Sequence, residues 1–415
     1  MNILFLDAYY EPEKIAYTHL ENDLIEGLVS DGHKIRIICP TPTRGIDKKT
    51  REEYKNKLLE KKYNGFVTVN RFKAPHEGKN PIMRALRYFW CNLRTYQIAT
   101  KRNDIDIVFS NSTPPTQGAL SGIVAHKLSK KNGKKVPFIY NLQDIFPDSL
   151  VNSNLTHDRS FIWKIGRKLE NFTYNHADKI VVISQSFKKN LLAKGISENK
   201  IEIISNWIDL ETVQPVERKN NKLIQEFGLD PNKFFVVYAG NFGEAQGADI
   251  VLKVAKQLEE NNGIRFVIFG GGPYFEDAKK EAKGLKNVFI HPLMPQDRIS
   301  DVYSLGDIAL ITCKAGTGKA GMPSKLWSIM ACNTPIIASF DADSELAEVI
   351  SKSQGGKCIE PEDSSAMSDA IIEASKTYCP YDTDLREYVL KNASKQLCVK
   401  EYIKIIKRYE YSQAN

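Results

Sequence analysis

The chain has 415 residues, of which 42% are hydrophobic and 10% aromatic, enough for the cores of two or three domains. A charged fraction of 26% excludes a disordered or fibrous protein, and no apolar run approaches the ~18 residues of a membrane-spanning helix. The net charge of +8 permits a polyanionic partner, such as phosphate, nucleic acid or an anionic bilayer, without selecting one.

Short apolar runs alternate with amphipathic stretches along the first half of the chain. They predict strands at 2–6, 34–39, 66–72, 106–110, 136–142, 179–184 and 201–204, and helices at 18–30, 81–102, 116–131, 159–175 and 186–193. Several of the strands are continuous Ile/Val/Leu/Phe runs, which is typical of strands buried on both faces of a parallel sheet.

The second half repeats the alternation. It predicts strands at 234–239, 265–269, 288–291, 308–312, 335–338 and 357–359, and helices at 248–260, 275–283, 298–305, 324–331, 344–350 and 366–375. Two series of βα units indicate an α/β protein with two Rossmann-like, doubly wound parallel sheets.

The polar stretch 211–232 marks the seam between the two series. We therefore expect a first domain over 1–210, a second over 211–381, and a basic helical tail over 382–415 that packs back on the first domain. Open α/β sheets bind ligands at the carboxyl ends of their strands, so the loops that follow strands are the candidate sites.

The chain begins with an apolar run that has no basic residue before it and stops at Asp7, so no signal peptide is expected. The seven cysteines are odd in number and form no Cys-x-x-Cys pair. This predicts reduced cysteines packed as small hydrophobic side chains, and argues against a zinc site.

Glycines follow two strands of the second series. The first group is Gly240, Asn241, Phe242 and Gly243, with Gln246 before the next helix, and the second is Gly270, Gly271 and Gly272. Glycine lets backbone N–H groups approach a ligand closely, and the start of a helix favours an anion such as a diphosphate. The alternative for the first group is an ordinary tight turn.

A third glycine segment contains Gly316, Gly318 and Gly321, which match G-x-G-x-x-G, and Asp341 follows beyond the next strand. In outline this is the fingerprint of a dinucleotide-binding site, which would make the protein an NAD-dependent oxidoreductase. Met322-Pro323-Ser324 delays the helix, however, and Lys325 puts a cation near its start. A cation there suits a phosphate that becomes a leaving group.

Two loops of the first series carry further candidates. Asp144 follows the strand 136–142, where a carboxylate can orient or deprotonate a hydroxyl nucleophile; the alternative is a turn or capping residue. The first loop contains Tyr10 and Lys14 as candidate substrate contacts.

Six segments in order carry a family resemblance: 177–184, 203–209 (Ile-Ile-Ser-Asn-Trp-Ile-Asp), 238–243, 270–273, 305–309 and 330–335 (Met-Ala-Cys-Asn-Thr-Pro). Together they resemble retaining nucleotide-sugar glycosyltransferases of family 4, which have the GT-B fold, over nearly the whole chain. Residues 322–326 and 143–148 resemble a bacterial surface-polysaccharide branch that includes N-acetylfucosamine-type transferases.

The resemblance implies that the first domain binds the acceptor and the second a UDP-sugar. The donor side would be the Gly240–Gly243 backbone with Gln246, Gly270, Gly271, the His291–Leu293 backbone, Met322, Pro323, Ser324 and Lys325, and the catalytic residues would be Asp144 and Lys325. The sugar, an N-acetylated deoxyhexosamine in this branch, would pass to a hydroxyl of a polyprenyl-diphosphate-linked saccharide in capsule or O-antigen biosynthesis.

No cofactor or metal is expected. Asp104-Ile-Asp106 and Asp341-Ala-Asp343 match a DxD metal motif, but one leads into a strand and the other caps a helix. The chain also departs from the family, because Ala320 and Ser328 stand where many members have two glutamates. This leaves the ribose contact unassigned and keeps open a second reading, a catalytically weak nucleotide-sugar-binding protein.

The segment 81–102 contains Arg84, Arg87, Arg94, Lys101 and Arg102 on one helical face and no acidic residue. The opposite face is apolar, and we expect it to pack on the domain core. The cations are then either simply solvated or attract an anionic inner-leaflet surface, which would place a cytoplasmic enzyme peripherally on the membrane and contribute acceptor contacts through Arg84, Arg87 and Arg94. No nucleic-acid partner is expected.

Overall fold

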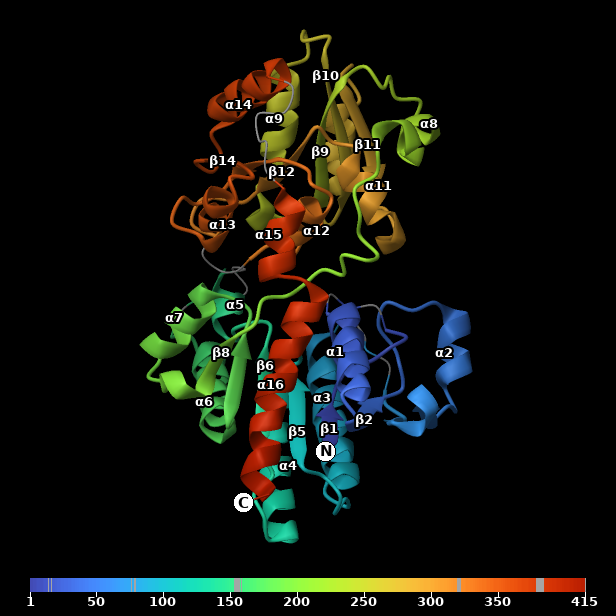
Figure 1. Cartoon of the computed structure of the whole chain (residues 1–415), viewed down its shortest axis with the longest axis vertical. Helices are drawn as coiled ribbons and strands as arrows, with labels where there is room; N and C mark the ends of the chain where they lie inside the picture. The colour runs from blue at the N-terminus through green and yellow to red at the C-terminus, as the bar shows by residue number, and fades with distance from the viewer. Residues whose placement is uncertain are drawn as a thin grey trace. The chain divides into compact units, whose positions relative to one another are not determined.

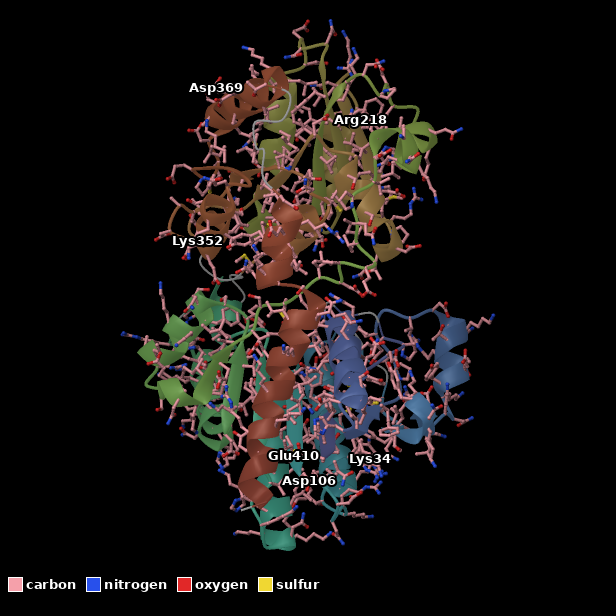
Figure 2. All side chains as sticks on the ribbon, viewed as in Figure 1. Lys34, Asp106, Arg218, Lys352, Asp369 and Glu410 are labelled. Carbon is pink, nitrogen blue, oxygen red and sulfur yellow. The ribbon has the colours of Figure 1, made fainter. Side chains whose placement is uncertain are left out.

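The computed structural model describes residues 1–13, 15, 17–75, 77, 80–152, 157, 159–318, 322–377 and 384–414. It divides into two compact units, Met1–Ser205 with Cys398–Asn415, and Asn206–Leu397 (Figure 1). Charged side chains such as Lys352 and Asp369 project from the outer surface (Figure 2). In the part that is described, no helix is long and apolar enough to cross a membrane.

The first unit contains an eight-stranded sheet with the order β3-β4-β2-β1-β5-β6-β7-β8. The strands are β1 (Asn2–Leu6), β2 (Lys34–Pro40), β3 (Leu59–Lys62), β4 (Val67–Phe72), β5 (Ile107–Asn111), β6 (Phe138–Leu142), β7 (Lys179–Val182) and β8 (Ile201–Ile203). Only the edge strand β3 is antiparallel to its neighbour. The central strands are buried on both faces, as their continuous apolar runs predict.

The helices of this unit are α1 (Thr18–Ser30), α2 (Lys48–Tyr54), α3 (Pro81–Ala99), α4 (Thr116–Asn132), α5 (Asp148–Asn152), α6 (Phe161–His176), α7 (Gln185–Ala193) and α16 (Lys395–Ala414). One face of the sheet packs in a core that includes residues of α3, α4, α6 and α7. On the other face, Phe109 of β5 contacts both Phe5 of β1 and Tyr402 of α16.

The second unit contains a parallel six-stranded sheet with the order β11-β10-β9-β12-β13-β14. The strands are β9 (Phe234–Asn241), β10 (Ile264–Gly271), β11 (Val288–Pro292), β12 (Ile308–Thr312), β13 (Ile336–Ser339) and β14 (Gly356–Ile359). The helices are α8 (Lys222–Glu226), α9 (Asp249–Gln257), α10 (Phe275–Ala282), α11 (Ile299–Ser304), α12 (Lys325–Ala331), α13 (Glu345–Ser353), α14 (Ser364–Lys376) and α15 (Leu385–Asn392). Apolar clusters fill both faces of this sheet.

The predicted fold class is confirmed, since both units contain α/β sheets that are parallel except at the edge strand β3. The sequence patterns missed α2, α5, α8 and β3. β3 reads Leu-Glu-Lys-Lys and buries none of its residues, so it has no apolar alternation from which a strand is recognised.

The predicted tail, 382–415, is divided between the two units. Leu385 and Val389 of α15 are buried in the core of the second unit, and Arg386 donates to the carbonyls of Val213 (2.7 Å) and Ala331 (2.9 Å). The chain returns to the first unit at Cys398. In this last segment, Lys407 of α16 pairs with Asp31 at 2.7 Å. Both crossings therefore differ from the predicted boundaries at 210 and 382.

Helix α3 packs with the face opposite to the predicted one. Arg87 is only 1% exposed, whereas Phe89 on the apolar face is 70% exposed. The expectation that the arginines are solvated is therefore wrong for Arg87. Its guanidinium is held inside by the carbonyl of Pro75 (2.9 Å) and the hydroxyl of Thr43 (3.1 Å).

Candidate functional site

In the second unit, the adjacent strands β9 and β10 both carry glycine at their carboxyl ends, as Gly240 in β9 and as Gly270 and Gly271 in β10. Gly240 lies beside Gly270 in the parallel register. A Cβ atom on Gly240 would come within 2.8 Å of the Lys325 Nζ, and one on Gly270 within 2.3 Å of the Phe275 ring. A side chain at either position would force a neighbouring side chain to move, and without one the two strand ends form a bare backbone surface, the glycine floor, at the carboxyl edge of the sheet.

Lys325, the first residue of α12, reaches over this floor. Its ammonium donates to the Ala239 carbonyl at 3.2 Å and lies 4.4 Å from the centre of the Tyr238 ring. Burial lowers the pKa of Lys325 to about 8, and no neighbouring carboxylate among the described residues counteracts that effect. A partly buried cation without a counter-charge is an electrostatic site for an anion.

The loop after β9 is fixed in place beside the floor. The buried Phe242 ring packs edge-on against Tyr238, with 5.5 Å between centroids. Farther along, the Gln246 carbonyl accepts from the Thr312 hydroxyl at 2.7 Å. Asn241 remains exposed and Gly243 partly so. The backbone around Asn241 and Gly243 is therefore rigid and accessible.

Strand β11 lies next to β10 and borders the glycine floor. The Leu293 N–H donates to the Gly270 carbonyl at 2.9 Å, and the Leu293 side chain is exposed, 3.0 Å from a Cβ position on Gly271. The His291 ring stacks on Phe227 with 3.7 Å between centroids, and burial lowers its pKa. The imidazole is thus packed among aromatic rings, while Leu293 presents an apolar surface beside the glycines.

The structure argues against a dinucleotide-binding site at Gly316 and Gly318. One carboxylate oxygen of Asp341 accepts from the Gly316 N–H (2.8 Å) and the other from the Gly318 N–H (2.7 Å). Asp341 therefore braces the glycine loop instead of standing free for a ribose, and the same bonds use N–H groups that a diphosphate would need. Gly321, with Lys319 and Ala320, lies outside the described residues. Met322 and Pro323 are partly exposed and Ser324 is exposed ahead of α12.

In the first unit, three neighbouring strands end in polar residues that bond to one another. The Asn141 amide donates to Asn111 at 2.8 Å, and the Asn111 amide donates to Glu21 (2.7 Å) and Asp7 (3.3 Å). Tyr402 of α16 donates to Asn141 at 3.0 Å. This polar row runs along the carboxyl edge of the sheet from β1 to β6.

Asp144 stands at the β6 end of the row. The Ser112 hydroxyl accepts from the N–H groups of Gln143 (3.0 Å) and Asp144 (3.2 Å), which holds the loop. The residue is exposed, yet surrounding protein still desolvates its carboxyl and, with the nearby Asp148 charge, raises its pKa. A raised pKa makes this accessible carboxylate a better proton acceptor.

Asp7 and Glu21 form a buried carboxyl pair within hydrogen-bonding range of each other. Burial raises the pKa of Asp7 to about 7 and that of Glu21 well above its ordinary value. At neutral pH the pair therefore keeps at least one proton, which the two carboxyls share.

The first loop is described only in part, and its described part does not present Tyr10 outward. Tyr10 is buried, and its hydroxyl bonds to Glu11 at 3.2 Å, so its side chain does not face a substrate. Lys14 lies outside the described residues. The loop is anchored by Glu13, whose carboxylate accepts from the N–H groups of Thr43 and Arg44, both at 2.7 Å.

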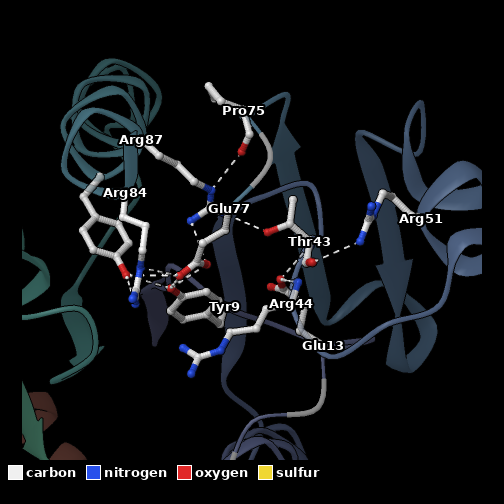
Figure 3. A network of polar contacts seen from close by, with 10 residues as sticks. Tyr9, Glu13, Thr43, Arg44, Arg51, Pro75, Glu77, Arg84 and Arg87 are labelled. Carbon is white, nitrogen blue, oxygen red and sulfur yellow. Dashed lines mark hydrogen bonds and ion pairs between the residues drawn. The ribbon is translucent and has the colours of Figure 1, made fainter. Parts of the chain in front are cut away.

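Figure 3 shows the polar network that joins this loop to α3. The Glu77 carboxylate accepts from the Tyr9 hydroxyl at 2.9 Å and pairs with Arg84 (3.4 Å) and Arg87 (3.5 Å). Arg94, two turns farther on, donates to Gln97 at 2.9 Å. Of the three predicted α3 cations, Arg87 is structural, while Arg84 and Arg94 retain partial exposure.

Sequence reasoning missed the polar row, Glu13 and Glu77. Asp7, Asn111 and Asn141 each interrupt an apolar run at its carboxyl end, which is a visible signal for residues that meet at one sheet edge. Glu13 and Glu77 offered no such pattern. No group of three His, Cys, Asp or Glu side chains is placed to hold a metal ion, as far as the described residues extend.

Comparisons with known proteins agree with this division into two halves. Residues 219–396 match the family model of glycosyl transferases group 1, and residues 22–212 match that of glycosyltransferase family 4. The chain is 24% identical to the putative colanic acid biosynthesis glycosyl transferase WcaI of Escherichia coli, over 98% of this chain and 100% of that protein. It is 26% identical to the probable glycosyltransferase WbjE of Pseudomonas aeruginosa, over 73% and 74% of the two chains.

Solved structures share the fold. Sucrose-phosphate synthase from Thermosynechococcus elongatus superposes with a TM-score of 0.74 at 14% identity, covering 99% of both chains. HepE of Anabaena, solved in complex with UDP, superposes with a TM-score of 0.71 at 15% identity, over 98% of this chain and 100% of that one. The chain is a glycosyltransferase with the GT-B fold, in which two Rossmann-like units carry the two family domains.

Proposed function

We propose that this GT-B glycosyltransferase transfers a sugar, with retention, from a UDP-sugar to a hydroxyl of a lipid-diphosphate-linked saccharide in bacterial surface-polysaccharide synthesis. The observation that carries the donor assignment is the Lys325 ammonium over the glycine floor, which has no carboxylate partner among the described residues. A diphosphate supplies the missing counter-charge, and bare backbone at Gly240 and Gly270 lets it approach. UDP is the nucleotide named for the HepE complex.

Lys325 acts in the leaving step. As the bond between sugar and diphosphate breaks, negative charge accumulates on the departing phosphate oxygen. A cation already in place stabilises that charge without reorganisation, which supplies the role a divalent metal plays elsewhere. The exposed Leu293 beside Gly271 offers an apolar surface for the base. We expect turnover to persist in EDTA.

The acceptor side is assigned to the first unit. Asp144 is an accessible carboxylate of raised pKa, suited to orient the attacking hydroxyl and take up its proton. The polysaccharide context comes from WcaI, whose name specifies colanic acid biosynthesis. We further propose that the sugar is an N-acetylated deoxyhexosamine and that the reaction takes place at the cytoplasmic face of the membrane.

The test is a screen of UDP- and GDP-sugars with the purified protein, with products identified by mass spectrometry. We expect hydrolysis of one UDP-sugar even without acceptor, and Lys325→Ala should lower the rate by ~10²–10³. The matched control is Lys352→Ala, an exposed lysine of the same unit (Figure 2) that should leave the rate unchanged. UDP binding with no hydrolysis of any sugar donor would instead favour a nucleotide-sugar-binding protein.

A further inference from the structure

Helix α3 exposes a continuous apolar strip. Its outward side chains are Met83, Leu86, Phe89, Trp90 and Leu93, each between 40% and 70% exposed. Their spacing of three and four residues places them along one side of the helix. Single exposed apolar residues are ordinary, but a contiguous strip marks an interaction surface.

The orientation of α3 is held by strong polar contacts. The guanidinium of Arg87 is buried and bonded to Pro75, Thr43 and Glu77 on the inward side (Figure 3). Turning the helix to bury the apolar strip would break these contacts. The Arg87 guanidinium would then be either exposed or buried without partners. The outward position of the strip is therefore a stable feature of the fold.

Helix α6 repeats the arrangement. Phe161, Ile162 and Ile165 lie in its first two turns and are each more than half exposed. Both α3 and α6 pack against α4 and contribute to the same core. Each connects parallel strands, so each begins at the carboxyl edge of the sheet. The two apolar surfaces therefore flank α4 on one face of the sheet, at the edge that carries Asp144.

The charges on these three helices identify the partner. α3 and α4 contain no acidic residue, and the single one in α6, Glu170, is buried and paired with Lys194 at 2.7 Å. The exposed charged residues of α4 and α6 are lysines: Lys127, Lys130, Lys131, Lys164 and Lys168. A second copy of this face would meet it with like charge, whereas an anionic bilayer accepts both the cations and the apolar side chains.

We infer that the α3–α4–α6 layer is a membrane-binding face, in which the apolar strips of α3 and α6 enter the interfacial zone of an anionic bilayer and the lysines contact its phosphates. This face extends beyond the site of transfer and does not depend on which sugar is donated. It differs from the arginine-driven attraction expected from the sequence, because Arg87 is buried and the apolar side chains are the ones presented outward.

The test is flotation of the full-length protein with vesicles of phosphatidylcholine alone or with added phosphatidylglycerol. We expect binding to the anionic vesicles, weakened at least ~10-fold by Leu86→Glu with Phe89→Glu. Lys164→Ala with Lys168→Ala should weaken it about 30-fold, since each cation near an anionic surface contributes ~1 kcal/mol. The matched control is Leu59→Glu with Leu390→Glu, because these leucines are as exposed (59% and 53%) but lie elsewhere.

Insertion is read separately from adsorption. Lipids brominated in the acyl chain should quench part of the tryptophan fluorescence of the bound protein, and Trp90→Phe should remove that part. Vesicle binding unaffected by the Leu86 and Phe89 changes would overturn the inference. So would a dimer in solution that the same two changes dissociate, which would make the face a self-association surface. Donor hydrolysis should stay at the wild-type rate in every variant, so a failure here is distinguishable from a failure of the proposed reaction.

Discussion

Lys325 is the residue whose surroundings are least explained by folding alone. Its ammonium is desolvated, and the Ala239 carbonyl and Tyr238 ring that it contacts carry no charge to neutralise it. Proteins keep a charged group in such an unfavourable environment mainly where the charge is needed for function. The task proposed here requires the protonated form.

The pH dependence of kcat/KM for the donor follows from the pKa of Lys325. The free enzyme holds this lysine at a pKa of about 8, so the cation is lost as the pH rises through that value. We expect kcat/KM to fall about tenfold per pH unit above pH 8. A plateau extending to pH 10 (about where an unperturbed lysine begins to titrate) would contradict the assignment.

Asp144→Asn should separate the two substrates. The amide keeps the shape of the carboxylate but cannot accept a proton, so acceptor-dependent turnover should fall by ~10²–10⁴. The Kd for UDP, measured by calorimetry, should stay unchanged because the nucleotide is assigned to the other unit. A variant that loses UDP binding would move Asp144 to the donor side. Asp148→Asn is a poor control, since Asp148 pairs with Lys194 at 2.7 Å.

At the scale of elements, two adjacent strand ends create the donor site by omitting side chains. Gly270→Ala should weaken UDP binding and lower stability by ~1–3 kcal/mol, because its Cβ would lie 2.3 Å from the Phe275 ring. The control is Gly284→Ala, where no atom lies within 4 Å of the added Cβ. Urea denaturation and UDP titration of both variants measure the two effects. Equal behaviour of the two variants would mean that Gly270 is not confined.

The α3 helix shows how far an amphipathic pattern can be interpreted. Its two faces were separated correctly from the sequence, but the assignment of inside and outside was wrong. Arg87 packs inward because Glu77, Thr43 and Pro75 supply partners from other elements. Nothing within the helix itself specifies those partners.

At the scale of the molecule, the polar row couples the first strand to the last helix. Asp7 and Glu21 share a proton at one end, and Tyr402 of α16 bonds to Asn141 at the other. The row thus joins residues 7 and 402 and is one of the contacts between the end of the chain and the rest of the first unit.

This pair makes stability pH-dependent. The pKa of Asp7 is raised by folding to about 7, so the stabilising protonated form is fully present below the unfolded pKa of 3.8 and is lost as the pH rises through 7. Over that window the free energy of unfolding should fall, because the folded chain still holds a proton that the unfolded chain has already released.

The variant Asp7→Asn has no ionisable group at this position, so the decline of the unfolding free energy between about pH 4 and 7, the window between the unfolded and folded pKa values, should become shallower. Denaturant titrations at several pH values measure this. Glu26→Gln, an exposed carboxyl on the same helix as Glu21, should leave the pH dependence as in the wild type. An unchanged slope in Asp7→Asn would mean that the pair is not a shared-proton site.

The sequence by itself determined most of the succession of strands and helices, the two largely parallel sheets and the glycines near the strand ends of the donor side. These features depend on local periodicity and on residues next to strand ends, which are visible without knowing distant neighbours. Only the tertiary structure decided that Asp341 braces the loop of Gly316 and Gly318, that α15 and α16 belong to different units, and that α3 turns its arginine inward. Each of these depends on hydrogen bonds and packing between residues far apart in the chain, and such partners are brought together only when the chain has folded.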